Sequence, residues 1–276
     1  MRRRRLAAEL RRLRNAAGLT IDEASSALGW QQSKISRTEN RQYGISSSDV
    51  RKLLDVYGVK DLEQRDQLAE MARRATERGW WQSFDVNSTY ANLIGLEEEA
   101  AIIRNYEPEL VPGLLQTEDY AREITRALWL SATPDQIERR VEVRMARQVI
   151  LRRNNPPPPQ VTVILNEGVL RRQVGGIETM RAQLLRLGTA HEQANVIVQV
   201  LPFTAGAHAA MVGPFQLLDF PDPADPGVVN VENVTGSLAL EKPQELREYS
   251  EAWNAIQALA LSPVDSRTII NSFALR

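Results

Sequence analysis

The chain has 276 residues, of which 43% are apolar and 25% are charged, a composition typical of soluble globular proteins and long enough for two domains. This composition excludes disordered and collagen-like proteins. Because the sequence has neither an apolar run of about 18 residues nor the apolar core of a signal peptide, we expect a cytoplasmic protein without a membrane segment. Cysteine is absent and only two histidines occur, His191 and His208, so disulfides, thiolate chemistry and most metal sites are excluded and no cofactor is expected.

The charge is divided unevenly along the chain. Residues 1–78 contain 17 Lys and Arg against 11 Asp and Glu, a net charge of +6, and the remaining residues carry a net charge of −7. The excess is densest at the beginning, where Arg2, Arg3, Arg4 and Arg5 follow one another. Such a run indicates either a solvated helix face or a surface that faces nucleic acid. The residues that follow favour the second interpretation.

Apolar spacing and capping signals predict that residues 1–78 form an all-α domain of five helices. Thr20 and Glu23 form a capping box at the start of a short second helix, and Gly29 ends this helix in a tight turn. The predicted helices are a first helix up to Ala17, followed by residues 20–28, 30–39, 46–57 and 62–76.

The third predicted helix has an unusual surface. Ile35 is its buried anchor, and amide, hydroxyl and cationic side chains occupy its outer faces. Such groups hydrogen-bond to base edges and phosphates, and a helix of this length fits the major groove of duplex DNA. This surface therefore predicts binding to double-stranded DNA.

The stretch from Leu19 to Glu39 resembles the helix-turn-helix of the Cro and phage-repressor type, the XRE family. Residues 1–78 as a whole, called the head below, resemble the lambda-repressor fold. The resemblance includes the Leu28-Gly29 turn and the anchor Ile35. It implies that Gln32, Ser33 and Arg37 read base edges, a role that suits glutamine toward adenine and arginine toward guanine. The residues expected to contact the DNA backbone are Arg2, Arg3, Arg4, Arg5, Thr20, Gln31, Lys34, Ser36, Asn40, Arg41 and Tyr43.

Three positions depart from the family pattern. Ile21 stands where the family usually has a glutamine bonded to phosphate, so one contact is lost. Thr38 replaces an aliphatic core residue, and Arg41 replaces a glycine and offers a further cation to the DNA backbone. We also expect the arginines at positions 2–5 to form an arm that contacts phosphates or the minor groove.

Residues 79–276 are predicted to form a larger α+β domain with a mixed or antiparallel sheet, because several helices are followed by strands mixed with helices. Gly79, Trp80 and Trp81 are interpreted as a short packed joint, and residues 155–160 as a proline-rich connector. The apolar, proline-interrupted stretch over residues 102–114 has no assigned element. The expected strands are residues 160–165, 196–201, 213–220 and 228–232, and the expected helices are residues 117–130, 134–153, 177–194 and 243–260.

Four motifs of this second domain, at residues 106–120, 174–181, 200–208 and 213–215, resemble the domain that follows an XRE-type head in many actinobacterial regulators. That family is described as antitoxin-like or development-associated, and its members are often encoded beside a small protein that is thought to bind them. The resemblance implies a transcriptional regulator whose second domain binds a protein or senses a signal. We expect a homodimer, because one recognition helix reads only a few base pairs.

Three roles for the second domain stay open. Binding of a small protein through exposed apolar residues of the segments 111–120 or 201–208 is favoured, because the sequence offers few buried polar groups to orient a ligand. A small-effector pocket is the alternative, with aromatic walls from Tyr106, Trp129, Phe203, Phe215 and Phe220.

An enzyme is the weakest of the three readings, because the sequence lacks the common nucleophile, phosphate-loop and metalloprotease motifs. Its candidate groups are more often found on surfaces or in turns. These groups are His208, Glu97, Glu98, Glu99, Asp219, Asp222 and Asp225.

Overall fold

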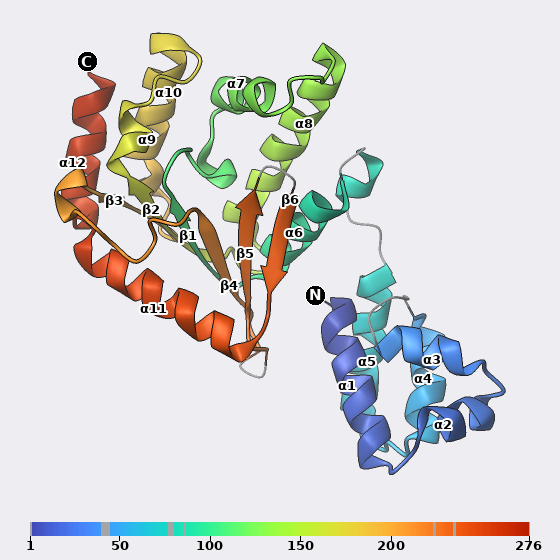
Figure 1. The fold of residues 1–276 in the computed structure, drawn as a ribbon. Coiled ribbons are helices and arrows are strands. Elements are labelled where there is room, and N and C mark those ends of the chain that lie inside the picture. Colours follow the sequence, from blue (N-terminus) through green and yellow to red (C-terminus); the bar gives the residue numbers. More distant parts are fainter. Residues whose placement is uncertain are drawn as a thin grey trace. The chain divides into compact units, whose positions relative to one another are not determined.

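The computed structural model describes residues 2–39, 45–76, 80–84, 87–222, 225–233 and 236–275, drawn as ribbons in Figure 1. The chain divides into two compact units, Met1–Trp80 and Trp81–Arg276, and each is described by itself. No described helix is both long enough and apolar enough to cross a membrane.

All regular elements described in the first unit, apart from the 3-10 turn that begins at Trp80, are α-helices, which confirms the predicted five-helix head. Its core contains Leu10, Ile35, Leu53 and Leu54, each at most 1% exposed, and it draws on several of the helices. The elements are α1 (Arg2–Ala16), α2 (Ile21–Leu28), α3 (Gln32–Glu39), α4 (Ser47–Val56) and α5 (Leu62–Thr76).

Two details of this unit differ from the expectation. The third helix begins at Gln32 and not at Trp30. Gly29 adopts φ 64° and the Trp30 amide donates to the Ser25 carbonyl at 2.8 Å, so Trp30 and Gln31 still belong to the turn. Residues 2–5 are the first residues of α1 and do not form an extended arm, in keeping with the high helix propensity of arginine.

The strands described in the second unit form one six-stranded mixed sheet in the order β3-β2-β1-β4-β5-β6, which confirms the predicted α+β class (Figure 1). The first three strands run parallel to one another, and the other three continue the sheet in antiparallel pairs. They are β1 (Ile102–Glu107), β2 (Gln160–Asn166), β3 (Val196–Leu201), β4 (Phe215–Asp219), β5 (Val228–Asn233) and β6 (Gly236–Leu240).

Helices connect the parallel strands and pack against the sheet. The chain between β1 and β2 contains α7 and α8, and the chain between β2 and β3 contains α9 and α10. The helix after β6, α11, packs against one face of the sheet. Its Trp253 and Ile256 form a core there with Tyr106 and Phe215 of the sheet. The helices are α6 (Ser88–Glu99), α7 (Glu118–Leu128), α8 (Pro134–Arg147), α9 (Glu167–Arg171), α10 (Gly176–Gly188), α11 (Pro243–Leu259) and α12 (Pro263–Ala274), with short 3-10 turns at Trp80–Ser83, Gly113–Leu115, Gln148–Leu151, Ala190–Glu192 and Phe203–Ala205.

Several elements of this unit were misjudged or missed. The unassigned stretch at 102–114 contains β1, which lies in the interior of the sheet between β2 and β4. The helix expected to reach residue 153 ends at Arg147 and continues as a 3-10 turn, and the one expected to reach residue 194 ends at Gly188. The sequence pattern predicts no element at α6, α9, β6 or α12.

Candidate nucleic-acid interface

The turn between α2 and α3 is built from local hydrogen bonds. The Glu23 amide donates to Thr20 Oγ1 at 3.2 Å, and the Glu23 carboxylate accepts from the Thr20 amide at 2.8 Å, which confirms the predicted capping box. Hydrogen bonds from the Thr20 backbone and hydroxyl also lower the pKa of Glu23. In the middle of α2, Ser25 is buried and its hydroxyl donates to the Asp22 carbonyl at 2.9 Å, so this small polar residue is satisfied within its own helix.

The outward face of α3 carries the residues expected to read bases. Ile35 and Thr38 are buried, at 1% and 3% exposure, which turns Gln32, Ser33 and Arg37 outward, and all three are exposed. Thr38, the polar residue at a usual core position, is satisfied because its hydroxyl donates to the Lys34 carbonyl at 2.9 Å. The helix therefore presents an amide, a hydroxyl and a guanidinium on one accessible surface.

Neighbouring groups orient two of these side chains. Gln32 Nε2 donates to Asp22 Oδ1 at 2.8 Å, and Arg37 donates from Nε to the Ser33 carbonyl at 3.1 Å and from Nη2 to Ser33 Oγ at 3.2 Å. A side chain that is held in one rotamer loses less conformational entropy when it binds. The Gln32 oxygen stays available as an acceptor in this arrangement.

The residues expected to contact the DNA backbone have different surroundings. Thr20 and Gln31 are exposed, Ser36 is half-buried, and the Lys34 ammonium is paired with Asp49 at 2.8 Å and lies 3.6 Å from the centre of the Trp30 ring. A phosphate contact by Lys34 would therefore share or replace this ion pair. Three expected contacts, Asn40, Arg41 and Tyr43, lie outside the described residues, and so do the side chains at positions 2–5.

An ion pair that the sequence pattern did not predict joins α1 to the end of α3. Arg14 donates to Glu39 through two bonds, Nε to Oε1 at 2.7 Å and Nη2 to Oε2 at 2.8 Å, and its Nη1 donates to the Leu19 carbonyl at 2.7 Å. Arg14 and Glu39 are each 7% exposed, and hydrogen bonding to Glu39 raises the pKa of Arg14. The available signal was that Arg14 follows Leu10 at helical spacing and so belongs to the inward side of α1.

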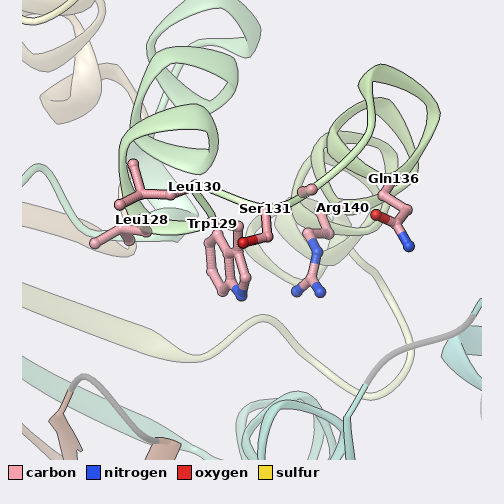
Figure 2. Close-up of a pocket in the computed structure, with 7 residues that line it drawn as sticks. Leu128, Trp129, Leu130, Ser131, Gln136 and Arg140 are labelled. Atoms are coloured by element: carbon pink, nitrogen blue, oxygen red, sulfur yellow. The ribbon is translucent and has the colours of Figure 1, made fainter.

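A shallow pocket of about 380 Å³ lies at the turn between α7 and α8 in the second unit (Figure 2). Its most distinctive pair is Trp129 and Arg140, whose guanidinium carbon lies 4.5 Å from the centre of the indole ring. Of the five aromatic residues expected to wall an effector pocket, Trp129 lines this one, whereas Tyr106 and Phe215 are buried in the core. The lining residues are Leu128, Trp129, Leu130, Ser131, Ala132, Gln136 and Arg140.

The segment 111–120 does not offer an exposed apolar surface, so the expectation was wrong for this segment, whereas Phe203 of the segment 201–208 is 57% exposed. Its apolar side chains, Val111, Leu114, Leu115 and Tyr120, are all buried. Its carbonyls are also bound, because Gln183 Nε2 and Arg186 Nε both donate to the Leu115 carbonyl, at 2.9 and 3.0 Å. Bound backbone and buried side chains make this turn a structural element.

The second unit also contains more buried polar groups than the sequence led us to expect. Gln216 alternates with Phe215 along β4 and so points to the sheet face opposite α11, where its Nε2 donates to Glu97 Oε1 at 3.0 Å. Arg147 Nε lies 2.8 Å from Glu97 Oε2. Burial disfavours the charged guanidinium, but the combined attraction of Glu97, Tyr90 and Glu232 outweighs burial and raises the pKa of Arg147. The expected scarcity of buried polar groups in the second unit is therefore wrong, and it does not favour a protein partner over a small effector.

Glu107, at the end of β1, adds a titratable group to the same sheet face. Desolvation, with a smaller contribution from Glu232, raises its pKa from its ordinary value of 4.5 to about 8. The folded state thus binds this proton more tightly than the unfolded state, and the stability contributed by the protonated group is lost as the pH rises through about 8.

Glu107→Gln is therefore expected to stabilise the chain relative to wild type by about 1–3 kcal/mol at pH 8.5, and by much less at pH 5. Thermal denaturation of both proteins at the two pH values measures the difference. Glu142→Gln changes an exposed carboxylate on α8 and serves as the control. If Glu107→Gln and Glu142→Gln respond to pH alike, the carboxylate of Glu107 ionises normally in the folded protein.

Three of the groups considered as catalytic candidates have structural partners. Asp219 pairs with Arg104 at 2.8 Å, Glu97 with Arg147, and His208 Nδ1 accepts a hydrogen bond from the Ala210 amide at 3.3 Å. Among the described residues, no group of three or more His, Cys, Asp or Glu side chains is arranged to hold a metal ion.

Comparison with protein families assigns both parts of the chain. Residues 5–68 match a family described as Helix-turn-helix domain, and residues 90–272 match the family described as Domain of unknown function (DUF5753). Comparison with curated proteins and with solved structures found no match. Because the second match covers well over half of the chain, the chain belongs to the DUF5753 family. The matched domain follows a helix-turn-helix head.

Proposed function

We propose that the chain is a sequence-specific regulator of transcription that binds double-stranded DNA through α3. The observation that carries this proposal is the exposed row of Gln32, Ser33 and Arg37 on the helix that follows the tight turn at Gly29, within the segment that matches a helix-turn-helix family. In this proposal these side chains contact base edges, as an XRE-type regulator would use them. The net charge of +6 on residues 1–78 supports attraction to the phosphate backbone.

The regulator acts as a homodimer in this proposal. Regulators with this docking geometry place two recognition helices in successive major grooves, one helical turn apart, so that a two-fold symmetric protein reads a two-fold symmetric site. It works on chromosomal DNA in the cytoplasm, and its partners are the duplex and a second copy of itself.

Gln32→Ala and Arg37→Ala are each expected to weaken binding to the preferred site by about 1–3 kcal/mol, or about 5- to 150-fold in Kd, and to leave binding to random duplex almost unchanged. The reason is that each change removes a side chain able to make a bidentate contact with one base. Titration of labelled specific and random duplexes measures both constants.

Two controls separate base reading from charge. Arg51→Ala removes an exposed cation from α4, and replacing the four arginines at positions 2–5 with alanine removes a run of positive charge. The fourfold variant is expected to weaken binding to all duplexes and to flatten its salt dependence, because phosphate contacts release counterions. Equal losses at specific and random DNA for the α3 variants would contradict the assigned roles.

Selection of bound duplexes from a random pool, at two salt concentrations, tests the proposed function. We expect enrichment of a two-fold symmetric site that persists at the higher salt concentration, since base contacts are less sensitive to salt than phosphate contacts. If no sequence is enriched at either concentration, the chain alone is not a sequence-specific DNA-binding protein.

For the second domain we propose binding of a small protein, in the manner of the antitoxin-like actinobacterial regulators that the motifs resemble, and no catalytic role. The exposed apolar side chains at the α7–α8 turn support this, because Leu130 is 90% exposed and Leu128 is 56% exposed. Capture from cell extract by wild type and by Leu130→Ser, with DNA binding as the control, tests it. A partner that both proteins retain equally would contradict docking at this turn.

A small effector is the second candidate, and the pocket in Figure 2 is the observation that favours it. Arg140 over the Trp129 ring offers a positive charge beside a flat apolar surface, which suits an aromatic or planar anion. A thermal-shift screen of wild type and Arg140→Ala against metabolite mixtures tests this role. Stabilisation that Arg140→Ala retains would place the effector elsewhere.

A further inference from the structure

The two edges of the sheet differ in whether another segment of the chain is hydrogen-bonded to them. At the β3 edge, the Leu261 amide donates to the Val200 carbonyl at 2.8 Å, and the Val200 amide donates to Ser266 Oγ at 2.9 Å. Gln199 Nε2 adds a bond to the Leu261 carbonyl at 2.9 Å. The segment between α11 and α12, together with Ser266 in the first turns of α12, thus covers this edge. Proteins commonly cover an edge in this way, which prevents strand pairing with another chain.

The β6 edge is not hydrogen-bonded to a covering segment among the described residues, although α6 packs against β6, with Thr89 beside Gly236. β6 is the last strand in the sheet order, beyond β5, as Figure 1 shows. Asn233 and Gly236 close a hairpin with two residues between them, so they form a hydrogen-bonded pair, and the alternation of the ladder makes Leu238 and Leu240 bond to β5 as well. The backbone groups of Ser237 and Ala239 therefore point away from the sheet, and no hydrogen bond to them occurs within the described residues.

The sequence of β6 also lacks the usual protection of an edge strand. Residues Gly236–Leu240 read GSLAL and contain no charge and no proline, although charges and prolines are the common devices that blunt exposed edges. Leu238 is opposite Val231 and is 57% exposed, so it extends the apolar face that α11 covers elsewhere. An uncharged open edge with an exposed leucine at its centre is a template for another strand.

We propose that β6 is the dimer surface and that it pairs antiparallel with β6 of a second copy, with the two Leu238 side chains facing each other at the two-fold axis. In this register Ser237 is opposite Ala239 of the second copy, and these residues exchange hydrogen bonds through the groups that point outward. The segment is thus complementary to itself, which is what an isologous two-fold contact requires. No charged residue faces another across residues 236–240. The inference rests on the proposed function in one respect, because it names the surface of the dimer that a symmetric site demands.

A cysteine cross-link tests the register directly. Leu238 forms a non-hydrogen-bonded pair with its copy in this register, where Cα atoms lie about 4.5 Å apart, a separation that allows a disulfide. Because the chain contains no cysteine, oxidation of Leu238→Cys is expected to yield one covalent dimer on a non-reducing gel. Val212→Cys is the control, since residue 212 is 93% exposed in the loop before β4 and should stay monomeric on the same gel.

Loss of one outward amide gives a second test. Ala239→Pro removes a donor that faces away from β5, so it breaks no bond of the β5–β6 ladder, and it is expected to raise the dimer dissociation constant about tenfold or more. Ser237→Thr keeps every backbone donor and should dimerise like wild type. Light scattering over a range of concentrations measures the constants, and circular dichroism checks that Ala239→Pro is folded.

The possible results separate this inference from the proposed function. Cross-linking of Leu238→Cys together with weakened dimers of Ala239→Pro supports pairing through β6. A dimer that selects a symmetric DNA site but neither cross-links at Leu238 nor responds to Ala239→Pro overturns the inference and leaves the proposed function standing. A monomer whose β6 pairs only with another protein also overturns it, because the occupant would then not be a second copy.

Discussion

Arg14→Met is expected to lower the free energy of unfolding of the helical unit by about 3–5 kcal/mol. The change leaves the Glu39 carboxylate at 7% exposure without the two hydrogen bonds that Arg14 now donates, at 2.7 and 2.8 Å. It also removes the bond from Arg14 Nη1 to the Leu19 carbonyl, just before α2. Because Glu39 is the last residue of α3, the variant should weaken DNA binding as well, by disturbing the position of that helix.

Urea denaturation followed by circular dichroism measures the stability change, and hydrogen exchange locates it in α1 to α5. Arg12→Met is the matched control, because Arg12 pairs with Glu9 on the exposed side of the same helix and should cost at most about 1 kcal/mol. The double variant Arg14→Met with Glu39→Met should recover part of the loss, since it leaves no unpaired buried charge. Equal losses for Arg14→Met and Arg12→Met would mean that the buried pair contributes no more than the exposed one.

Arg147→Met is expected to have an effect of similar size, about 3–5 kcal/mol, on the second unit. Glu97 is fully buried and relies on Arg147 at 2.8 Å and on Gln216 at 3.0 Å, so loss of the guanidinium leaves a carboxylate in the core with one neutral donor. The Arg147 side chain also lies over the Tyr90 ring at 5.4 Å. Both contacts of Arg147 join α8 to α6, and Glu97 in turn joins α6 to β4 through Gln216.

Hydrogen exchange of the full chain distinguishes this loss from a general one, because amides of the second unit should exchange faster and those of α1 to α5 should not. Arg126→Met is the control, since Arg126 pairs with Glu123 on the surface of α7. Arg147→Met with Glu97→Gln removes both charges and should be more stable than Arg147→Met alone. The same stability for the single and the double variant would show that Glu97 is already neutral or solvated.

The local part of the head was predictable because its determinants are close in the sequence. The capping box at Thr20 and Glu23 and the left-handed Gly29 are short-range features, and both are present in the structure. Ile35 was sufficient to fix which side of α3 is buried, since a helix has one rotation once a single face is known. The exposure of Gln32 and Arg37 follows from that rotation, whereas their role toward bases stays a prediction.

Residues 102–107 illustrate why the second unit was harder to predict. Ile103 and Tyr106 are buried but stand three positions apart, and β1 is covered on both faces, so strict alternation of apolar and polar residues is absent. The strand is recognisable only by its partners, β2 and β4, which lie more than 50 residues away along the chain.

The sequence by itself determined the class of each unit, the capping and turn of the helix-turn-helix and the face that α3 exposes, because these depend on residue type and on spacing within one or two helical turns. Only the tertiary structure decided which polar residues are buried, as with Arg14 and Glu39, or Arg147 and Glu97, because each charge is tolerated in a core only through a partner on another element. It also decided which sheet edge is covered and which is open, since the covering segment at Leu261 and Ser266 follows β3 by some 60 residues. These contacts join distant parts of the chain, and periodicity carries no information about them.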